Sequence, residues 1–262
     1  MIKILVNGAH GRMGQTVVGA VLDDPELELV GAVDAIAEDD VGELIGRGKI
    51  GIPIETVLSK AIDDRQPEVM IDFTRPSVVF FNAMTALSKK VSPVIGTTGL
   101  STAAIEQLRA ETIATDTPAF IAPNFAIGAV LMMKFAVEAS KYFPDVEIIE
   151  LHHDKKLDAP SGTAELTAKM INEVRAAHKQ GHPEEVEKLA HVRGGEREGI
   201  RLHSVRLPGF VAHQEVIFGG LGQTLTIRHD SINRESFMPG VMLACKKVRS
   251  LKGVTIGLDK LL

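Results

Sequence analysis

The chain has 262 residues, of which 45% are hydrophobic and 24% charged, and its formal net charge is −5 at pH 7. This composition is typical of a globular protein, and no apolar run reaches the roughly 20 residues needed to span a bilayer. The negative charge, without a basic tail or a basic stripe interleaved with aromatic residues, argues against a nucleic-acid partner and favours small-molecule chemistry.

The first half of the chain alternates short apolar strands with amphipathic helices. The first strand runs directly into a glycine loop, without the long apolar core and cleavage site of a signal peptide, so we expect a cytoplasmic protein. The expected strands are residues 2–6, 27–33, 69–73, 94–96 and 119–122, separated by helices such as 14–22 and 102–111. This alternation predicts a parallel sheet covered by helices on both faces, with ligands at the strand ends.

The second half has a different pattern. A strand over 146–151 and a helix over 161–177 precede a charged stretch, 178–201, that we expect to be rich in loops. Three consecutive strand-like runs follow at 202–207, 214–218 and 224–228, and the glycines between the last two predict a tight turn. We expect these three strands to pair as an antiparallel sheet.

The C-terminal segment returns to the pattern of the first half, with a helix at about 236–250 and a strand at 254–258. We expect it to complete the parallel domain. Cys245, the single cysteine, lies in an apolar stretch of that helix and is interpreted as a core residue without a catalytic role. The fold class is therefore α/β, with a Rossmann-type parallel sheet and a second, mixed α/β domain that contains an antiparallel sheet.

The first glycine loop, GAHGRMG, follows a strand and opens a helix, as a dinucleotide-binding loop requires. Its spacing is G-x-x-G-x-x-G and not the usual G-x-G-x-x-G, so a purely structural turn is the alternative. The expected cofactor-binding residues in this loop are Gly8, Ala9, His10, Gly11, Arg12 and Met13.

Asp34 ends the next strand, where an acid can accept hydrogen bonds from the ribose diol of a dinucleotide. The alternative is a loop or capping acid. Ala35, Ile36 and Ala37 follow it without a base that would bind a 2′-phosphate, so NADH is expected ahead of NADPH. Arg12 leaves use of both cofactors, NADH and/or NADPH, open.

Two further strand ends carry small and polar residues that could let backbone groups approach a nicotinamide and its ribose. They are Gly96, Thr97 and Thr98, and then Ala122, Pro123, Asn124 and Phe125. The pair Phe73 and Thr74 is a weaker candidate, and an ordinary turn is the alternative at each position.

The segment ELHHDKKLDAPSGTA, residues 150–164, places imidazoles, ammonium groups and a helix-starting Ser-Gly-Thr turn directly after a strand. His152 and His153 can donate or accept protons near neutral pH, whereas Lys155 and Lys156 can donate to an anionic substrate. The turn can bind a carboxylate or phosphate. A metal site that includes Asp154 and Asp158 is disfavoured, because adjacent residues of an extended chain point to opposite faces.

Taken together, GAHGRMG, IDFT, GTTG, APNFAIG, ELHHDKKLDAPSGTA and HSVRLPGFVAHQEVIFG resemble the 4-hydroxy-tetrahydrodipicolinate reductase (dihydrodipicolinate reductase) family of lysine biosynthesis, nearly from end to end. The resemblance implies a homotetramer of two-domain subunits. We place the dinucleotide-binding domain at 1–125, completed by 235–262, and the substrate-binding and tetramerisation domain at 126–234.

The resemblance also implies the reaction and the site. A cyclic dicarboxylate substrate is reduced by hydride from NAD(P)H with loss of water, in the diaminopimelate route to lysine. The catalytic histidine and the proton-donating lysine of the family fall on His152 and Lys156, and its substrate-binding positions on His153, Gly162 and Thr163. Lys155 is expected to stay at the surface, and which of His152 and Lys156 gives the proton is left open.

A non-enzymatic alternative is a regulator that senses NADH through a Rossmann domain. Such a protein needs a partner-binding or DNA-binding element, and it has no use for the histidine-lysine segment. The sequence shows no helix-turn-helix with basic flanks.

Overall fold

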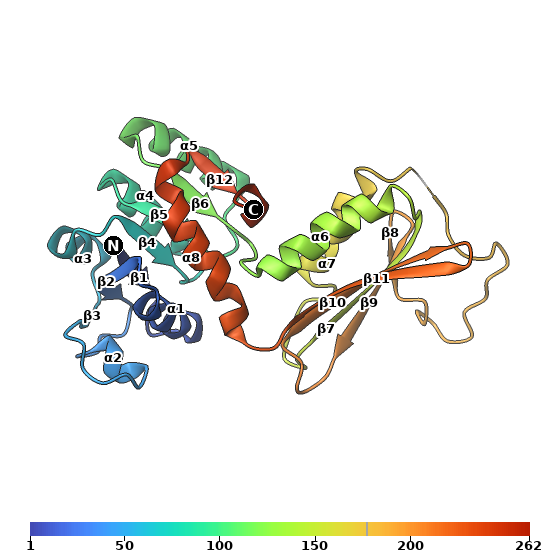
Figure 1. Ribbon diagram of the computed structural model, residues 1–262, viewed down its shortest axis with the longest axis horizontal. Coiled ribbons are helices and arrows are strands. Elements are labelled where there is room, and N and C mark those ends of the chain that lie inside the picture. Colours follow the sequence, from blue (N-terminus) through green and yellow to red (C-terminus); the bar gives the residue numbers. More distant parts are fainter. Residues whose placement is uncertain (177) are drawn as a thin grey trace. The chain divides into compact units, whose positions relative to one another are not determined.

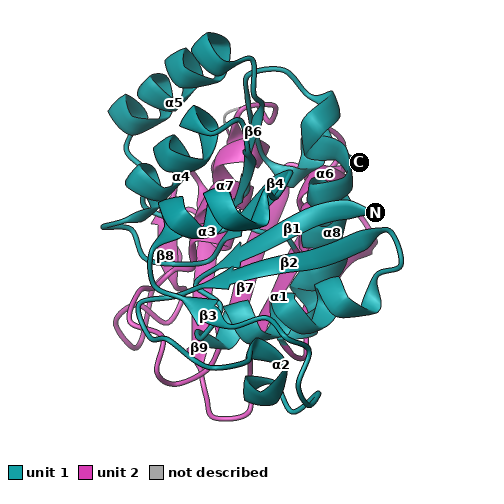
Figure 2. Cartoon of the chain, turned by 90° about the vertical axis from the view of Figure 1, so that its left-hand side faces the viewer, with its two compact units in different colours: residues 1–125, 234–262 teal, residues 126–233 magenta. Residues whose placement is uncertain are grey.

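The computed structural model describes residues 1–176 and 178–262, which form two compact units. Unit 1 comprises residues 1–125 and 234–262, and unit 2 comprises residues 126–233 (Figures 1 and 2). Among the described helices, none combines the length and apolar character that crossing a membrane would require.

Unit 1 is built on a seven-stranded sheet in which every pairing is parallel. Its order is β12-β6-β5-β4-β1-β2-β3, so the chain changes direction across the sheet between β1 and β4 (Figure 1). A switch point of this kind is where open α/β sheets bind ligands. The strands are β1 (Ile2–Asn7), β2 (Leu27–Val33), β3 (Ile54–Glu55), β4 (Val69–Asp72), β5 (Ser92–Ile95), β6 (Ala119–Ile121) and β12 (Val254–Ile256).

The helices of unit 1 follow from apolar residues at helical spacing. In α1 the buried residues Val17, Val18 and Val21 form one stripe, and the Ser101 hydroxyl caps α5 by accepting from the Ala104 N–H. The α-helices are α1 (Arg12–Asp23), α2 (Val41–Leu44), α3 (Leu58–Arg65), α4 (Val79–Ser88), α5 (Thr102–Thr115) and α8 (Met238–Lys247). Three short 3₁₀ helices, η1 (Arg234–Phe237), η2 (Val248–Ser250) and η3 (Leu258–Lys260), lie near the C-terminus.

Two predictions from the sequence are confirmed: the sheet of unit 1 is parallel, and the C-terminal segment completes it. The C-terminal strand β12 pairs with β6 and so extends the N-terminal sheet, and Cys245 is buried in α8. Burial raises the pKa of the Cys245 thiol, which suits a core residue.

Unit 2 is a five-stranded mixed sheet with the order β11-β10-β7-β9-β8, together with two helices. Its elements are α6 (Ile127–Ser140), β7 (Asp145–His152), α7 (Gly162–Asn172), β8 (Gly195–Arg197), β9 (Ile200–Arg206), β10 (Ala212–Gly220) and β11 (Gln223–Ser231). The hairpin β10–β11 is antiparallel, as predicted.

The expectation that all three late strands pair consecutively is wrong for β9. This strand lies beside β7 and runs parallel to it, while β7 separates β9 from β10. A parallel pair needs a long crossover, and α7 with the chain after it provides one. The glycine turn at 219–222 determines only the β10–β11 hairpin, so the partner of β9 is decided by packing.

The helix predicted over 161–177 is shorter than expected and ends at Asn172, while the predicted end at residue 177 lies outside the described residues. Just beyond the helix, the Arg175 side chain donates to the carbonyls of Pro144 and Glu198, at 2.8 and 2.9 Å. The stretch expected to be loop-rich also contains β8, which forms a hairpin with β9 through Glu198 and Gly199, both at positive φ.

Candidate functional site

The glycine loop lies at the end of β1, beside the switch point of the unit 1 sheet. Gly8 has a φ of +86°, and a Cβ there would lie 2.5 Å from the Phe73 carbonyl oxygen. A Cβ on Gly14 would lie 2.0 Å from the Gly8 carbonyl oxygen. The backbone is therefore folded back so tightly that only glycine fits these two positions.

Helix α1 begins directly after this loop. Gly11 is its N-cap residue, and no side chain caps the helix there. The first N–H groups of a helix lack intrahelical partners and bind anions well, so the loop suits a pyrophosphate. Ala9 is buried, Arg12 is exposed and Met13 is half-buried, which leaves Arg12 on the surface of the loop.

Asp34 comes directly after β2 and touches the glycine loop. Its Oδ2 accepts from the His10 backbone N–H at 3.0 Å. His10 Nε2 also lies 3.3 Å from a carboxylate oxygen of Glu38. Two carboxylates, Asp34 and Glu38, thus flank the loop.

The ends of β5 and β6 are held by aromatic packing. A Cβ on Gly96 would lie 2.1 Å from the Phe73 ring, so glycine is needed for the ring to fit. The Phe73 ring also packs against Phe125, with centroids 5.9 Å apart. Ala122 and Phe125 are buried, Asn124 is half-buried, and Thr98 and Pro123 are exposed. The weaker candidate Phe73 therefore contacts residues of two other predicted loops.

A buried carboxylate that the sequence reasoning did not select holds these strand ends together. Asp72, fully buried at the end of β4, accepts from the side-chain amides of Asn7 and Asn82, each at 2.9 Å. Its other oxygen accepts from the Thr97 hydroxyl at 2.8 Å and from the Thr74 hydroxyl at 2.7 Å. Because it connects the ends of β1, β4 and β5, Asp72 fixes the framework of the predicted cofactor loops.

In unit 2 the predicted catalytic residues lie at and just beyond the end of β7. His152 is the last residue of that strand, whereas His153 and Lys155 follow it and are exposed. Lys156 Nζ donates to both oxygens of Asp158, at 2.7 and 2.8 Å. This hydrogen bond lowers the pKa of the Asp158 carboxyl. Lys156 is therefore held by a mostly exposed carboxylate.

The predicted substrate-binding turn begins α7. The Ser161 hydroxyl caps the helix by accepting from the Ala164 N–H at 3.2 Å. Gly162 is exposed, and a Cβ on this residue would have no heavy atom within 4 Å. Thr163 is half-buried. The first turn of α7 thus presents backbone N–H groups at an accessible position, as anion binding requires.

Glu150 connects these parts, and sequence reasoning gave it no role. Its side chain is completely buried and is hydrogen-bonded to His152 Nδ1. It also accepts from the Ser161 N–H at 3.2 Å and from the two terminal nitrogens of Arg206 at 2.9 and 2.6 Å. Burial acts to raise the pKa of Glu150, but hydrogen bonds from His152, Arg206 and Ser204 outweigh it and lower the pKa to about 2.

The alternative metal site would use His152, His153, Asp154 and Asp158 as ligands. Among residues 1–176 and 178–262, no group of three or more His, Cys, Asp and Glu side chains is arranged to hold a metal ion. His152 is directed to Glu150 and Asp158 to Lys156, so two of the four proposed ligands have other partners.

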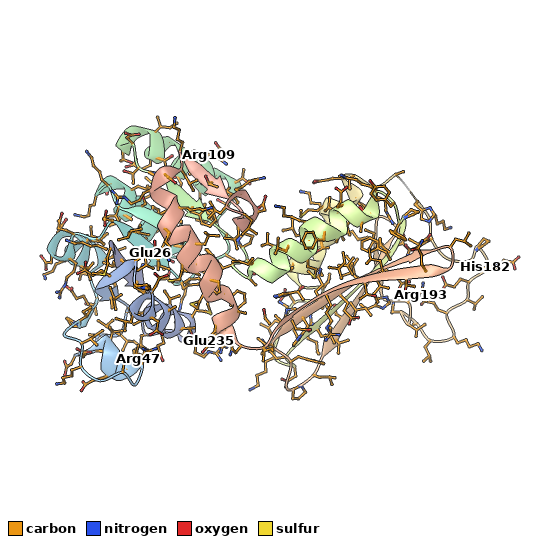
Figure 3. The ribbon with its side chains drawn as sticks, in the orientation of Figure 1. Glu26, Arg47, Arg109, His182, Arg193 and Glu235 are labelled. Carbon is orange, nitrogen blue, oxygen red and sulfur yellow. The ribbon has the colours of Figure 1, made fainter. Side chains whose placement is uncertain are left out.

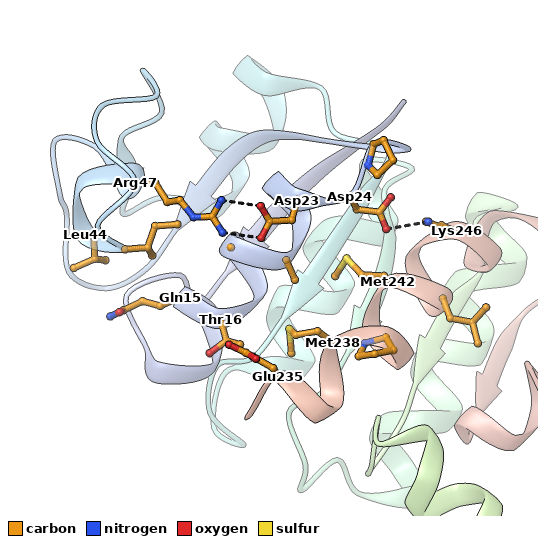
Figure 4. Close-up of a pocket in the computed structure, with 16 residues that line it drawn as sticks. Gln15, Thr16, Asp23, Asp24, Leu44, Arg47, Glu235, Met238, Met242 and Lys246 are labelled. Atoms are coloured by element: carbon orange, nitrogen blue, oxygen red, sulfur yellow. Dashed lines mark hydrogen bonds and ion pairs between the residues drawn. The ribbon is translucent and has the colours of Figure 1, made fainter. Parts of the chain in front are cut away.

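A cavity of about 990 Å³ lies elsewhere in unit 1, between α1, α8 and the chain after α2 (Figure 4). Its wall carries the ion pairs Arg47–Asp23, at 2.6 Å, and Lys246–Asp24, at 2.9 Å. None of the described residues that line it belongs to the predicted cofactor loops. We therefore place the candidate site at the strand ends and not in this cavity.

Comparison with known proteins gives the same assignment along the whole chain. The family model described as "Dihydrodipicolinate reductase, N-terminus" matches residues 2–125, and the model described as "Dihydrodipicolinate reductase, C-terminus" matches residues 128–262. A 4-hydroxy-tetrahydrodipicolinate reductase of Desulfitobacterium hafniense is 55% identical, over 100% of this chain and 98% of that protein. One of Listeria welshimeri is 50% identical over the full length of both.

Solved structures extend this similarity to the fold. The dipicolinate-bound dihydrodipicolinate reductase from Paenisporosarcina sp. TG-14 is 47% identical, with a TM-score of 0.89 and full coverage of both chains. An amine dehydrogenase from Mycobacterium smegmatis, at 13% identity and a TM-score of 0.70, shares the fold alone. The resemblance seen in the sequence motifs is confirmed, and the chain belongs to the dihydrodipicolinate reductase family.

Proposed function

We propose that this chain reduces 4-hydroxy-tetrahydrodipicolinate to tetrahydrodipicolinate in the diaminopimelate route to lysine. The substrate gains a hydride and a proton and loses its hydroxyl group as water. The observation that carries this proposal is the match of the entire chain, at 50% identity or more, to proteins named for this reaction. A nucleotide-sensing regulator is not favoured, since these relatives are named as enzymes.

Unit 1 holds the dinucleotide in this proposal. The backbone cradle leaves no room for side chains at Gly8 and Gly14 and opens at a helix N-terminus, so it fits a pyrophosphate. Asp34 would accept from the ribose, and the loops at 96–98 and 122–125 would hold the nicotinamide. When bound, the nicotinamide supplies the hydride.

Unit 2 binds the substrate and supplies the proton in this proposal. The exposed start of α7, at Gly162 and Thr163, binds one carboxylate of the substrate, with His153 as a further donor. As hydride reaches the conjugated imine, electron density moves to the ring nitrogen, and a protonated group must neutralise it. His152 and Lys156 are the residues assigned to this step.

The cofactor preference is the finer part of the proposal. We expect NADH ahead of NADPH because Asp34 and Glu38 would repel a 2′-phosphate and because Ala35 provides no cation. Arg12 is exposed in the same loop and could offset part of this repulsion, so some use of NADPH is compatible with the site. Ala35→Arg should shift the ratio of kcat/KM values toward NADPH.

The test of the activity is to follow NADH absorbance with freshly generated substrate. Oxidation of NADH that depends on the substrate is expected, and no oxidation at any pH would contradict the proposed activity. The same assay with NADPH measures the preference, and a kcat/KM ratio strongly in favour of NADPH would overturn the expectation from Asp34.

A homotetramer and a cytoplasmic location also belong to this proposal. Unit 2 has one sheet face against its helices, while the other face carries half-buried residues such as Ile149 and Ile217 that suit contact with a second subunit. Sedimentation velocity tests the tetramer, and cell fractionation tests the location.

A further inference from the structure

The substrate segment of unit 2 is organised around an ion pair buried beneath it. Glu150 contacts the His152 ring and the N-terminus of α7, while Arg206 holds Glu150 and donates to the Asp158 carbonyl at 2.9 Å. Asp158 in turn holds Lys156. The ion pair of Glu150 and Arg206 thus connects the His152 imidazole, the loop that carries Lys156 and the predicted substrate-binding turn.

We propose that Glu150, held by Arg206, is a positioning residue that fixes the Nδ1–H tautomer of His152 and leaves Nε2 to exchange the proton with the substrate. This inference rests on the proposed function, because it specifies how one of the assigned residues acts. It assigns roles to two residues, Glu150 and Arg206, that do not contact the reacting atoms themselves.

The tautomer follows from the chemistry of the contact. An ionised carboxylate has no proton to donate, so the ring nitrogen that faces it must carry the hydrogen. Glu150 is kept ionised by paired donors from Arg206 and by the Ser161 N–H. His152 Nδ1 is therefore a fixed donor, and Nε2 is the nitrogen that gains and loses a proton.

The sheet makes this arrangement rigid. Residues 150 and 152 are two apart on β7, so their side chains lie on the same face. Glu150 is completely buried, which keeps water from competing for its oxygens. On the neighbouring strands, Arg206 of β9 lies in register with His152, and uncharged residues, Gln214 and Ala212 of β10, face Glu150 and His152.

A side chain on the opposite face of β7 provides a matched control for Glu150. Glu147 accepts from Arg193 at 2.7 Å and is paired with His203 Nε2 at 2.8 Å (Figure 3 labels Arg193). Hydrogen bonds from Arg193 and His203 outweigh the effect of burial and lower the pKa of this carboxyl. Glu147 thus has the same kinds of partners as Glu150 but no place in the proposed site.

The experiment compares Glu150→Gln with Glu147→Gln in the full-length protein. In Glu150→Gln the side-chain amide can donate to Nδ1 and favour the opposite tautomer. We expect kcat to fall on the order of 10²-fold with an unchanged KM for NADH, as when the partner that orients a functional histidine is lost. The pH profile should also change shape, whereas Glu147→Gln should keep the wild-type kcat and profile.

A direct measurement separates positioning from folding. In protein labelled with ¹⁵N-histidine, the wild-type His152 resonances should report a protonated Nδ1. Glu150→Gln should change only the tautomer of His152, and Glu147→Gln only the resonances of His203. Because an unpaired Arg206 could destabilise unit 2, the double variant Glu150→Gln, Arg206→Met is measured as well. It should restore folding but not turnover.

Two results would overturn the inference: a wild-type His152 with an unprotonated Nδ1 at neutral pH, or full turnover in a folded Glu150→Gln variant. A different result would contradict the proposed function, namely the absence of NADH oxidation by the wild-type protein. The ring tautomer is read without substrate, so it tests the inference even if the reaction is another one.

Discussion

Lys156 Nζ lies 2.7 Å from Asp158 Oδ1, so the lysine assigned to proton donation is already paired with a carboxylate two residues away. The Asp158 side chain is 64% exposed, and an ion pair this accessible contributes little to stability. In the proposed function, this pair would hold the ammonium group in place and let it exchange partners when a dicarboxylate arrives.

The first prediction concerns this lysine. Lys156→Met should lower kcat roughly 10²-fold or more, because a group that can protonate the substrate or hold its anion is lost. The KM for NADH should stay unchanged, since the predicted cofactor residues belong to unit 1. Steady-state kinetics measures both, and the exposed neighbour provides the control, because Lys155→Met should be indistinguishable from wild type. Equal losses in the two variants would remove the assignment of Lys156.

The second prediction compares two glycines of α1. A Cβ on Gly14 would meet the Gly8 carbonyl oxygen at 2.0 Å, whereas a Cβ on Gly19 meets nothing within 4 Å. Gly14→Ala should displace the glycine loop and raise the Kd for NADH by about 10-fold or more, a loss of about 1.4 kcal/mol. Gly19→Ala should leave the Kd unchanged and stabilise unit 1 by about 0.5–1 kcal/mol. Fluorescence titration and urea unfolding test the pair, and tight NADH binding by Gly14→Ala would contradict the cradle.

The third prediction concerns the Asp72 network. Asp72→Asn replaces one carboxylate oxygen, a hydrogen-bond acceptor, with an NH₂ group, which is a donor. This group then faces either the donors of Asn7 and Asn82 or the donors of Thr74 and Thr97. It should destabilise unit 1 by about 1–3 kcal/mol and raise the KM for NADH, with little effect on the KM for substrate.

The control for Asp72 is a carboxylate in the same unit that is mostly exposed. Asp63 pairs with Lys89 at 2.6 Å, and its side chain is 61% exposed. Asp63→Asn should change the unfolding free energy by less than about 0.5 kcal/mol. If both substitutions had equal effects, the Asp72 network would have no special role in the framework.

The fourth prediction is a pH dependence of stability. The pKa of Glu150 is lowered from 4.5 to about 2 in the folded chain, so the folded form holds fewer protons than the unfolded form between these values. Its stabilisation, about 3 kcal/mol, is fully present above pH 4.5 and is lost as the pH falls through about 2. The unfolding free energies of wild type and Glu150→Gln should therefore converge as the pH falls from 6 to 3. A difference that stays constant in urea titrations over this range would contradict the assignment.

The sequence predicted unit 1 well because its signals are local. Apolar runs, glycine turns and acids at strand ends act within a few residues, and these were enough to place Gly8, Asp34 and Thr97 beside one sheet edge. The position of Asp34 at the end of β2 and its contact with His10 follow from the strand-loop-helix pattern itself.

The pairing in unit 2 was less predictable. The strand β9 is adjacent in sequence to β10, yet it pairs with β7 across the α7 crossover. Strand partners are selected by which faces can be buried together, and a period-2 pattern alone carries no information about that choice.

The residues proposed to react, His152 and Lys156, were predicted from one segment of the sequence and its resemblance to a known family. The tertiary structure alone revealed what holds them. Glu150 reads in the sequence as an ordinary acid within a strand, and Arg206 stands 56 residues away from it. Only folding brings these two charges together, and a completely buried carboxylate must find donors, so Glu150 binds the arginine, the imidazole and the helix start.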